Sequence, residues 1–171
     1  MQTLTRRHFV RNSALWLGCG LVAHSFANTL FAEEPAPPAE KPKKPPRLDL
    51  EIVKEFVGVS HGDLTRVKEL YAEYPTLINA TYDWGGGDFE TALGAASHTG
   101  QKEIAQYLLN NGARIDLFCA TMLGMLDVVQ KLFELQPVMK QTLGPHGLSL
   151  LHHAKKGEHP EMIAYIESIS G

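Results

Sequence analysis

The chain has 171 residues, of which 8% are aromatic and 20% charged, and its formal net charge is −3. This length suits one domain with short additional segments, and the composition is that of a folded protein and not of an intrinsically disordered one. Acidic residues outnumber basic ones beyond residue 32, which argues against general nucleic-acid binding, because such binding requires clustered basic side chains.

The amino-terminal segment, residues 1–32, has the features of an export signal. It contains the stretch TRRHFVR, and a weakly apolar run follows. The motif resembles the twin-arginine export signal, with Arg6, Arg7 and Phe9 at its defining positions. The apolar run is about half of the ~20 residues that a membrane-spanning helix needs, so we expect a cleaved signal and no stable membrane anchor afterwards.

The resemblance implies a bacterial protein that folds before export and works in the periplasm or otherwise outside the cytoplasm. We expect cleavage near residue 27 or residue 32. Two alternatives stay open, a signal retained as an anchor and a lipid-modified Cys19. Cys119 is the only cysteine beyond the signal, so the mature chain cannot form an intramolecular disulfide.

Residues 33–48 form a predicted linker. The stretch EEPAPPAEKPKKPPR holds six of the ten prolines in the chain and no large apolar residue. Such a segment cannot bury enough surface to offset the entropy of ordering it. We therefore expect an extended spacer between the signal and the folded domain.

Residues 49–171 contain four similar segments, each with two short predicted helices. Ile104, Leu108 and Leu109 form one apolar stripe on a second helix, and a single helix pair leaves such a stripe exposed. Stacked pairs bury the stripes as one continuous core. The four segments read HGDLTRVKELYAEYPTLIN, TALGAASHTGQKEIAQYLLNNGA, LFCATMLGMLDVVQKLFEL and SLLHHAKKGEHPEMIAYI.

These segments resemble the ankyrin repeat, whose pattern is T-P-L-H-x-A-A-x-x-G-x-x-x-I-V-x-x-L-L-x-x-G-A. The second segment departs from the pattern at Ala92 and Gly94, and the first segment is the most divergent. The resemblance implies an all-α fold, a short ankyrin-type solenoid of helical hairpins with about four repeats and irregular loops. It also implies a protein-binding scaffold.

The spacing of the repeats is irregular. We align their first-helix positions at Val53, Thr91, Ile115 and Ser149. The second and third positions are too close for a complete repeat, so one hairpin finger is predicted to be deleted between them. The first and second positions are farther apart, so an enlarged connection joins those repeats.

The enlarged connection contains DWGGGDFET at residues 83–91. It lacks the Gly-Lys-Ser/Thr ending of a nucleotide-binding loop, and its acidic residues would repel a phosphate. We interpret the glycines as a tight turn with positive φ angles. Trp84 and Phe89 on this loop are candidate anchors for a partner, because aromatic residues dominate interface hot spots; an alternative is that Trp84 closes the edge of the core.

Histidines and acids are frequent in the domain, but no pair has a recognised metal-ligand spacing such as H-E-x-x-H. We therefore predict no metal site, no cofactor and no catalytic residue. Cys119 lies among small residues and is expected to be a buried, inert thiol. The residues considered as ligands are His98, His146, His152, His153, His159, Asp83, Asp88 and Glu90.

The predicted function is non-catalytic recognition of an extracytoplasmic protein partner by a monomer that binds no nucleic acid. Two alternatives stay open: a metal-dependent enzyme with a His/Asp/Glu site in the groove, and an immunity or chaperone-like partner of a co-exported enzyme. The candidate contacts lie on connections or at first-helix ends, and they are Trp84, Asp88, Phe89, Glu90, His98 and His146.

Overall fold

The computed structural model describes residues 45–169. The predicted export signal, with Arg6, Arg7 and Phe9, and most of the predicted linker lie outside the described residues. None of the described helices has both the length and the apolar character needed to cross a membrane.

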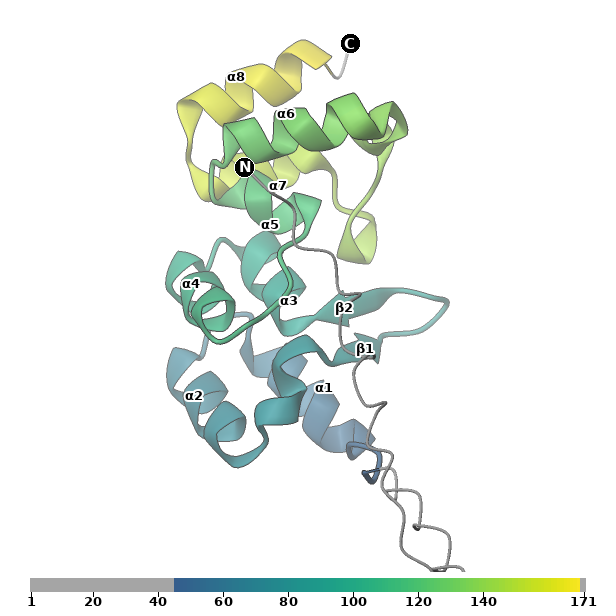
Figure 1. The fold of residues 1–171 in the computed structure, drawn as a ribbon, viewed down its shortest axis with the longest axis vertical. Helices are drawn as coiled ribbons and strands as arrows, with labels where there is room; N and C mark the ends of the chain where they lie inside the picture. The colour runs from purple at the N-terminus through teal and green to yellow at the C-terminus, as the bar shows by residue number, and fades with distance from the viewer. Residues whose placement is uncertain (1–44, 170–171) are drawn as a thin grey trace, which may run out of the picture. The chain divides into compact units, whose positions relative to one another are not determined.

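Eight α-helices form four consecutive pairs within the described part of the chain (Figure 1). Three short 3-10 helices and one two-stranded hairpin lie in the connections. The elements are α1 (Leu50–Val59), α2 (Leu64–Glu73), η1 (Pro75–Asn79), β1 (Thr81–Asp83), β2 (Phe89–Thr91), α3 (Ala92–Thr99), α4 (Lys102–Asn110), α5 (Leu117–Met122), α6 (Leu126–Leu135), η2 (Pro137–Gln141), η3 (Pro145–Gly147), α7 (Leu150–Gly157) and α8 (Pro160–Ile169).

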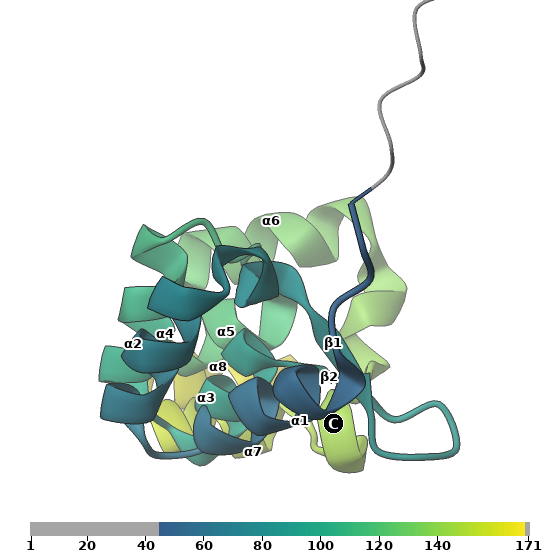
Figure 2. The ribbon, with the colours of Figure 1, turned by 90° about the horizontal axis from the view of Figure 1, so that it is seen from below.

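The first helices of the four pairs form the inner layer of the stack. In this layer α1 contacts α3, α3 contacts α5, and α5 contacts α7. The second helices, α2, α4, α6 and α8, form the other layer, and each packs on the first helix of its own pair (Figures 1 and 2). The predicted fold class, an all-α solenoid of about four helical hairpins, is confirmed.

Capping side chains determine where the first helices begin. Thr91, Asp116 and Ser149 each accept a hydrogen bond from the backbone N–H three residues ahead, at 3.0, 2.7 and 3.2 Å. Asp49 caps α1 through the N–H of Glu51. The alignment at Val53 and Ile115 was therefore wrong, by four residues and by one residue, because an aliphatic side chain cannot accept the capping hydrogen bond.

Proline or glycine follows three of the four second helices. Helix α2 stops at Glu73, just before Pro75, and α6 stops at Leu135, just before Pro137. Helix α4 is followed by Gly112, whose φ of 93° lies in the region that favours glycine.

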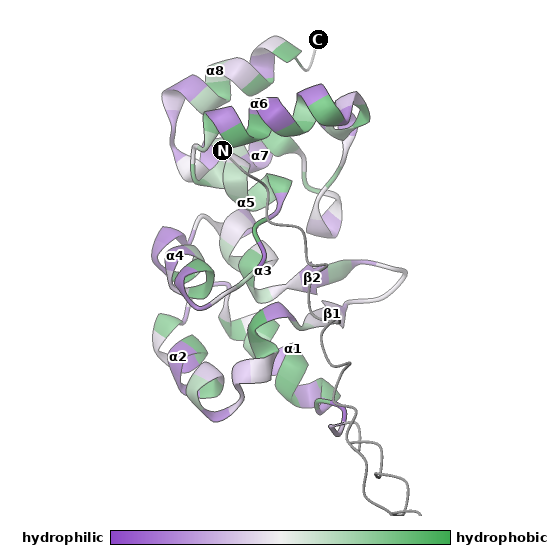
Figure 3. Cartoon of the chain, viewed as in Figure 1, coloured by the Kyte–Doolittle hydropathy of each residue, from purple (hydrophilic) through white to green (hydrophobic). Residues whose placement is uncertain are grey.

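The apolar stripes of the helices meet in two adjoining core clusters. Around α1 to α4 the largest buried side chains include Phe56, Leu93 and Leu108. Around α5 to α8 the core includes Phe133, Met162 and Ile166. Helix α6 turns its hydrophobic residues toward α5 and α7 and its hydrophilic residues outward (Figure 3). Each fully buried side chain of this kind contributes about 1.5–3 kcal/mol to stability.

Helices α5 and α7 approach each other more closely than side chains would allow. Gly157, the last residue of α7, lies against the backbone of Met122. A β-carbon at position 157 would overlap the carbonyl oxygen of Met122. The fourth repeat therefore packs on the third through backbone contact at this point.

The connections between the repeats differ in length and structure. Strands β1 and β2 form an antiparallel hairpin between the first two repeats, with Tyr82 opposite Glu90. Its turn contains Gly85, Gly86 and Gly87 with φ angles of 120°, 66° and 88°, which confirms the interpretation of the glycines as a turn.

The second and third repeats are joined without a hairpin, which confirms the predicted deletion of one finger. Residues 113–116, between the turn after α4 and the start of α5, have no regular secondary structure. The loop before α7 reaches the β1–β2 hairpin (Figures 1 and 2), where His146 contacts Asp88. The loop before the fourth repeat thus contacts the β1–β2 hairpin directly, with no hairpin of the third repeat between them.

Candidate functional site

The β1–β2 hairpin has two chemically different faces. Successive side chains of a strand point to opposite faces, so Tyr82 and Glu90 face the helices while Asp83 and Phe89 face outward. Trp84 continues the inner face, since its ring lies 4.8 Å from that of Tyr82 and its Nε1 donates a 2.8 Å hydrogen bond to Glu90 Oε2. Trp84 and Phe89, grouped together from the sequence, therefore belong to different surfaces.

Glu90 is a buried carboxylate at the centre of the site. The residue is only 1% exposed. Trp84 satisfies Oε2, but Oε1 is buried and makes no hydrogen bond of acceptable geometry with any described residue. Unpaired buried carboxylate oxygens are costly. Glu90 was predicted to contact a partner, but the hairpin turns its side chain away from solvent, so the side chain is not exposed for direct contact.

Three histidines surround the Glu90 carboxylate, and we refer to these four residues as the Glu90 cluster. His61 lies in the turn after α1, His98 in α3, and His146 in the loop before α7. Their Nε2 atoms lie 3.6, 2.9 and 3.4 Å from the nearest recorded Glu90 oxygen, which is Oε2 for His61 and Oε1 for the other two. The Nε2 atoms of His61 and His98 are 3.1 Å apart.

The other ring nitrogens of two histidines are held by hydrogen bonds. His61 Nδ1 lies 2.9 Å from the carbonyl oxygen of Gly58, and His146 Nδ1 lies 2.7 Å from Asp88 Oδ2. A carbonyl or carboxylate oxygen only accepts, so each Nδ1 carries the proton and donates it. In the neutral rings, Nε2 of both residues is then a lone pair directed into the cluster.

His146 is held in an uncommon backbone conformation. Its φ of 57° lies in the left-handed region, which costs a non-glycine residue of order 1 kcal/mol or more. Both carboxylate oxygens of Asp88 hydrogen-bond to His146. Oδ1 accepts from its backbone N–H at 2.8 Å, and Oδ2 accepts from its ring Nδ1 at 2.7 Å. Strained residues of this kind are frequent at functional sites.

The carboxylates of the site are stabilised in their charged form. Burial raises the pKa of Glu90. The contacts with the His98 ring and the Trp84 N–H, together with the charges of His61 and His98, lower it by more, so the pKa lies below its usual value. The backbone N–H of His146 is the main cause of the lowered pKa of Asp88. Burial lowers the pKa of His146, but its contacts with Asp88 and Glu90 outweigh burial and the pKa is raised.

The structure brings together most of the predicted contact residues. All of them except Phe89 lie in the Glu90 cluster or touch it. His98 lies near the end of α3, as expected, but its side chain is buried against Glu90 and is not exposed for contact with a partner. His61 was missed altogether, since nothing in the sequence indicates that the turn after α1 folds against β2.

His152, His153 and Cys119 have structural environments. His152 Nε2 lies 2.8 Å from the carbonyl oxygen of His98, which ties α7 to α3. His153 is fully buried, and burial lowers its pKa to about 4. Burial raises the pKa of the Cys119 thiol to about 12, which agrees with the predicted inert thiol.

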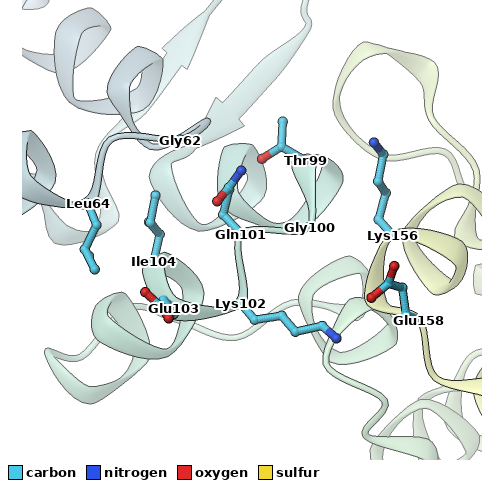
Figure 4. A pocket seen from close by; sticks show the side chains of 10 residues that line it. All are labelled: Gly62, Leu64, Thr99, Gly100, Gln101, Lys102, Glu103, Ile104, Lys156 and Glu158. Carbon is cyan, nitrogen blue, oxygen red and sulfur yellow. The ribbon is translucent and has the colours of Figure 1, made fainter.

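A separate pocket of about 560 Å³ lies at the turns that follow α1 and α3 (Figure 4). Its polar side chains have both signs of charge, and the lysines Lys102 and Lys156 point in different directions (Figure 4). None of the described pocket residues has a buried polar atom without a hydrogen bond. This pocket therefore lacks the convergence of polar atoms seen in the Glu90 cluster.

Residues 88–118 match the family model of the ankyrin repeat. The matched segment includes β2, α3, α4 and the start of α5. It supports the ankyrin repeat family, whose repeats serve in protein–protein interaction and are typically non-catalytic. No curated protein and no solved structure matches the chain.

Proposed function

We propose that the protein is an exported, non-catalytic scaffold that binds a protein partner through the outer face of the β1–β2 hairpin. The observation that carries the proposal is the exposure of Phe89, which is 61% exposed and begins β2 next to the turn of the hairpin. The hairpin projects from the helical stack (Figure 1). Large exposed aromatic residues on a rigid connection are typical of interface anchors. The ankyrin repeat match supports the same class of function.

The rigidity of the hairpin also supports a binding role. Glu90 and Thr91 lead directly into α3, and Asp88 is bonded to His146 of the fourth repeat. A contact surface held on both sides loses little conformational entropy when a partner binds. The outward Phe89 is thus presented by a connection that is already ordered.

Site-specific photo-crosslinking tests the binding surface. A photoreactive phenylalanine analogue in place of Phe89 should form discrete adducts with one or a few proteins in the native compartment, identified by mass spectrometry. The same analogue in place of Leu135, which is 81% exposed on α6, is the matched control. Equal adduct patterns at the two positions, or none at position 89, would reject the outer hairpin face as the binding surface.

Export is the second part of the proposal and rests on Arg6, Arg7 and Phe9 in the sequence. Replacing both Arg6 and Arg7 by lysine should retain the protein in the cytoplasm, measured by fractionation and immunoblotting. Arg11→Lys, which keeps the arginine pair, is the control and should be exported normally. Export of the double variant at the rate of the control would contradict the twin-arginine route.

A further inference from the structure

The geometry points to a metal site: we propose that His61, Glu90, His98 and His146 bind one divalent transition-metal ion, zinc, in a tetrahedral set of three imidazole nitrogens and one carboxylate oxygen. One ligand atom from each of the four residues lies within 4.8 Å of all the others. Imidazole and carboxylate are the ligand types that zinc binds together in proteins.

The spacing of the ligand atoms fits a tetrahedral ion. Zinc bonds of 2.0–2.2 Å to nitrogen and oxygen place neighbouring tetrahedral ligands about 3.3 Å apart. Glu90 Oε1 lies 2.9 Å from His98 Nε2 and 3.4 Å from His146 Nε2, and the Nε2 atoms of His61 and His98 are 3.1 Å apart. The four residues offer ligand atoms that all lie within 4.8 Å of one another. These separations are close to the tetrahedral value, and side-chain shifts of about 1.5 Å or less bring the remaining pairs to it.

Hydrogen bonds outside the cluster prepare the ligands for a cation. The Asp88 carboxylate and the Gly58 carbonyl hold the Nδ1–H groups of His146 and His61, so that both Nε2 lone pairs face inward. Metal-binding histidines in proteins are usually oriented in this way. Trp84 Nε1 donates a hydrogen bond to Glu90 Oε2, which leaves Oε1 free to bond to the metal.

While the rings are neutral, acceptor atoms of the cluster face one another unless a cation or a proton lies between them. The lone pair of His146 Nε2 faces Glu90 Oε1 at 3.4 Å, and that of His61 Nε2 faces Glu90 Oε2 at 3.6 Å. In the neutral rings only His98 can direct a proton from Nε2 into the cluster. Glu90 Oε1 is buried 2.9 Å from His98 Nε2 but makes no hydrogen bond of acceptable geometry with the described residues, so a cation at the centre would compensate its charge.

The proposed site is a closed structural site and not a catalytic one. Four protein ligands occupy all the coordination positions of a tetrahedral ion, whereas catalytic zinc sites keep one position open for water or substrate. The ion can enter from solvent, because the side chains of His61 and His146 are 30% and 34% exposed. It would join the turn after α1, strand β2, α3 and the loop before α7.

Metal titration of the untagged full chain tests the proposal. After chelator treatment, isothermal titration with zinc chloride should give one ion per chain, and cobalt(II) should give the intense visible bands of a tetrahedral complex. His61→Ala combined with His146→Ala should abolish both signals. These two residues are partly exposed, so the variant should keep its helical circular dichroism.

Two further variants separate ligands from bystanders. Asp88→Asn should retain one site but weaken zinc binding about 10–100-fold, because it removes the charge that orients His146. His159 lies outside the cluster, so the His159→Gln variant should bind zinc like the unmodified chain. Equal zinc affinity in the unmodified chain and the double His61/His146 variant, or a weak octahedral cobalt spectrum, would overturn the proposed site.

Discussion

The Glu90 cluster and the surroundings of His153 show two ways to bury a histidine in the same stack of helices. In the cluster, polar atoms from four separate segments converge on one point. At His153 one fully buried ring lies 4.9 Å from the ring of Phe118 and 5.5 Å from that of His152, with the Ser149 carbonyl as its recorded hydrogen-bond partner. Burial alone thus gives an inert structural side chain, whereas convergence of several side chains gives a candidate site.

The two regions also differ in what holds them together. Around His153 the fourth repeat rests on the third through the backbone contact of Gly157 with Met122. Around Glu90 it rests on the second repeat through the polar contacts of His146 with Asp88 and Glu90. Damage to the first region should therefore affect folding, and damage to the second should mainly affect the site.

The largest expected effect is that of Gly157→Ala in the apolar region. The added methyl group overlaps the Met122 carbonyl, so α5 and α7 must separate. Overpacking of this kind costs about 3 kcal/mol or more. Urea unfolding followed by circular dichroism measures the loss.

Gly58→Ala in α1 is the control, because nothing lies within 4 Å of a β-carbon built at this position. This variant should be more stable than the unmodified chain by about 0.5–1 kcal/mol. Similar stabilities for the two variants would contradict the close packing.

His153 should make stability depend on pH. Burial lowers its pKa from 6.5 in the unfolded chain to about 4 in the folded one. As pH falls, the unfolded state therefore binds a proton at His153 before the folded state does. The free energy of unfolding is unaffected by His153 above pH 6.5 and decreases as pH falls toward 4. The loss amounts to about 1.4 kcal/mol per pH unit over this window, about 3 kcal/mol in all.

Urea unfolding between pH 7.5 and pH 4 measures this dependence. His153→Gln should lose a slope of about one proton relative to the unmodified chain, whatever its stability at pH 7.5. The same slope in both proteins would mean that His153 is not held neutral by burial.

Trp84→Phe should have an intermediate effect in the Glu90 region. The ring contact with Tyr82 is kept, but Glu90 Oε2 loses its only recorded hydrogen-bond donor. Hydrogen bonds to buried charged groups contribute about 1.5–3 kcal/mol, so we expect a loss near 2 kcal/mol in urea unfolding. Tyr82→Phe, which leaves the Trp84–Glu90 bond intact, is the matched control. A loss no greater than that of the control would show that Oε2 does not depend on Trp84.

Phe89→Ala should have the smallest effect on stability, although Phe89 is the neighbour of Glu90. Its side chain lies on the outer hairpin face and is 61% exposed. Surface substitutions of this kind usually change stability by less than about 0.5 kcal/mol. Thermal unfolding monitored by circular dichroism should show a midpoint close to that of the unmodified chain. A drop as large as that of Trp84→Phe would place Phe89 in the core and remove the basis for the outer binding face.

Much of the fold could be predicted because its signals are local. The apolar stripe of Ile104 and Leu108, the capping residues Thr91 and Ser149, and the stops at Pro75 and Pro137 each act within one or two helical turns. At Val53 and Ile115 the repeat alignment disagrees with the helix starts, because the capping side chains are Asp49 and Asp116. The missing finger was likewise visible as a shortened spacing.

The candidate site could be predicted only as separate residues. The sequence predicts Asp88, Glu90, His98 and His146 individually as contacts for a partner, and their convergence has no signature in the chain. His61 is separated from His98 by 37 positions, and Asp88 from His146 by 58. No ligand-spacing motif describes side chains that meet across such distances.

The sequence by itself determined the helical pairs, their caps and their stacking into one all-α domain, because hydrophobic spacing, capping and turn residues act on neighbouring positions. The tertiary structure alone decided that Glu90 turns inward, that Phe89 turns outward, and that the loop before α7 closes over the hairpin. Those outcomes depend on strand register and on packing between distant repeats, and both are properties of the assembled stack rather than of any short segment.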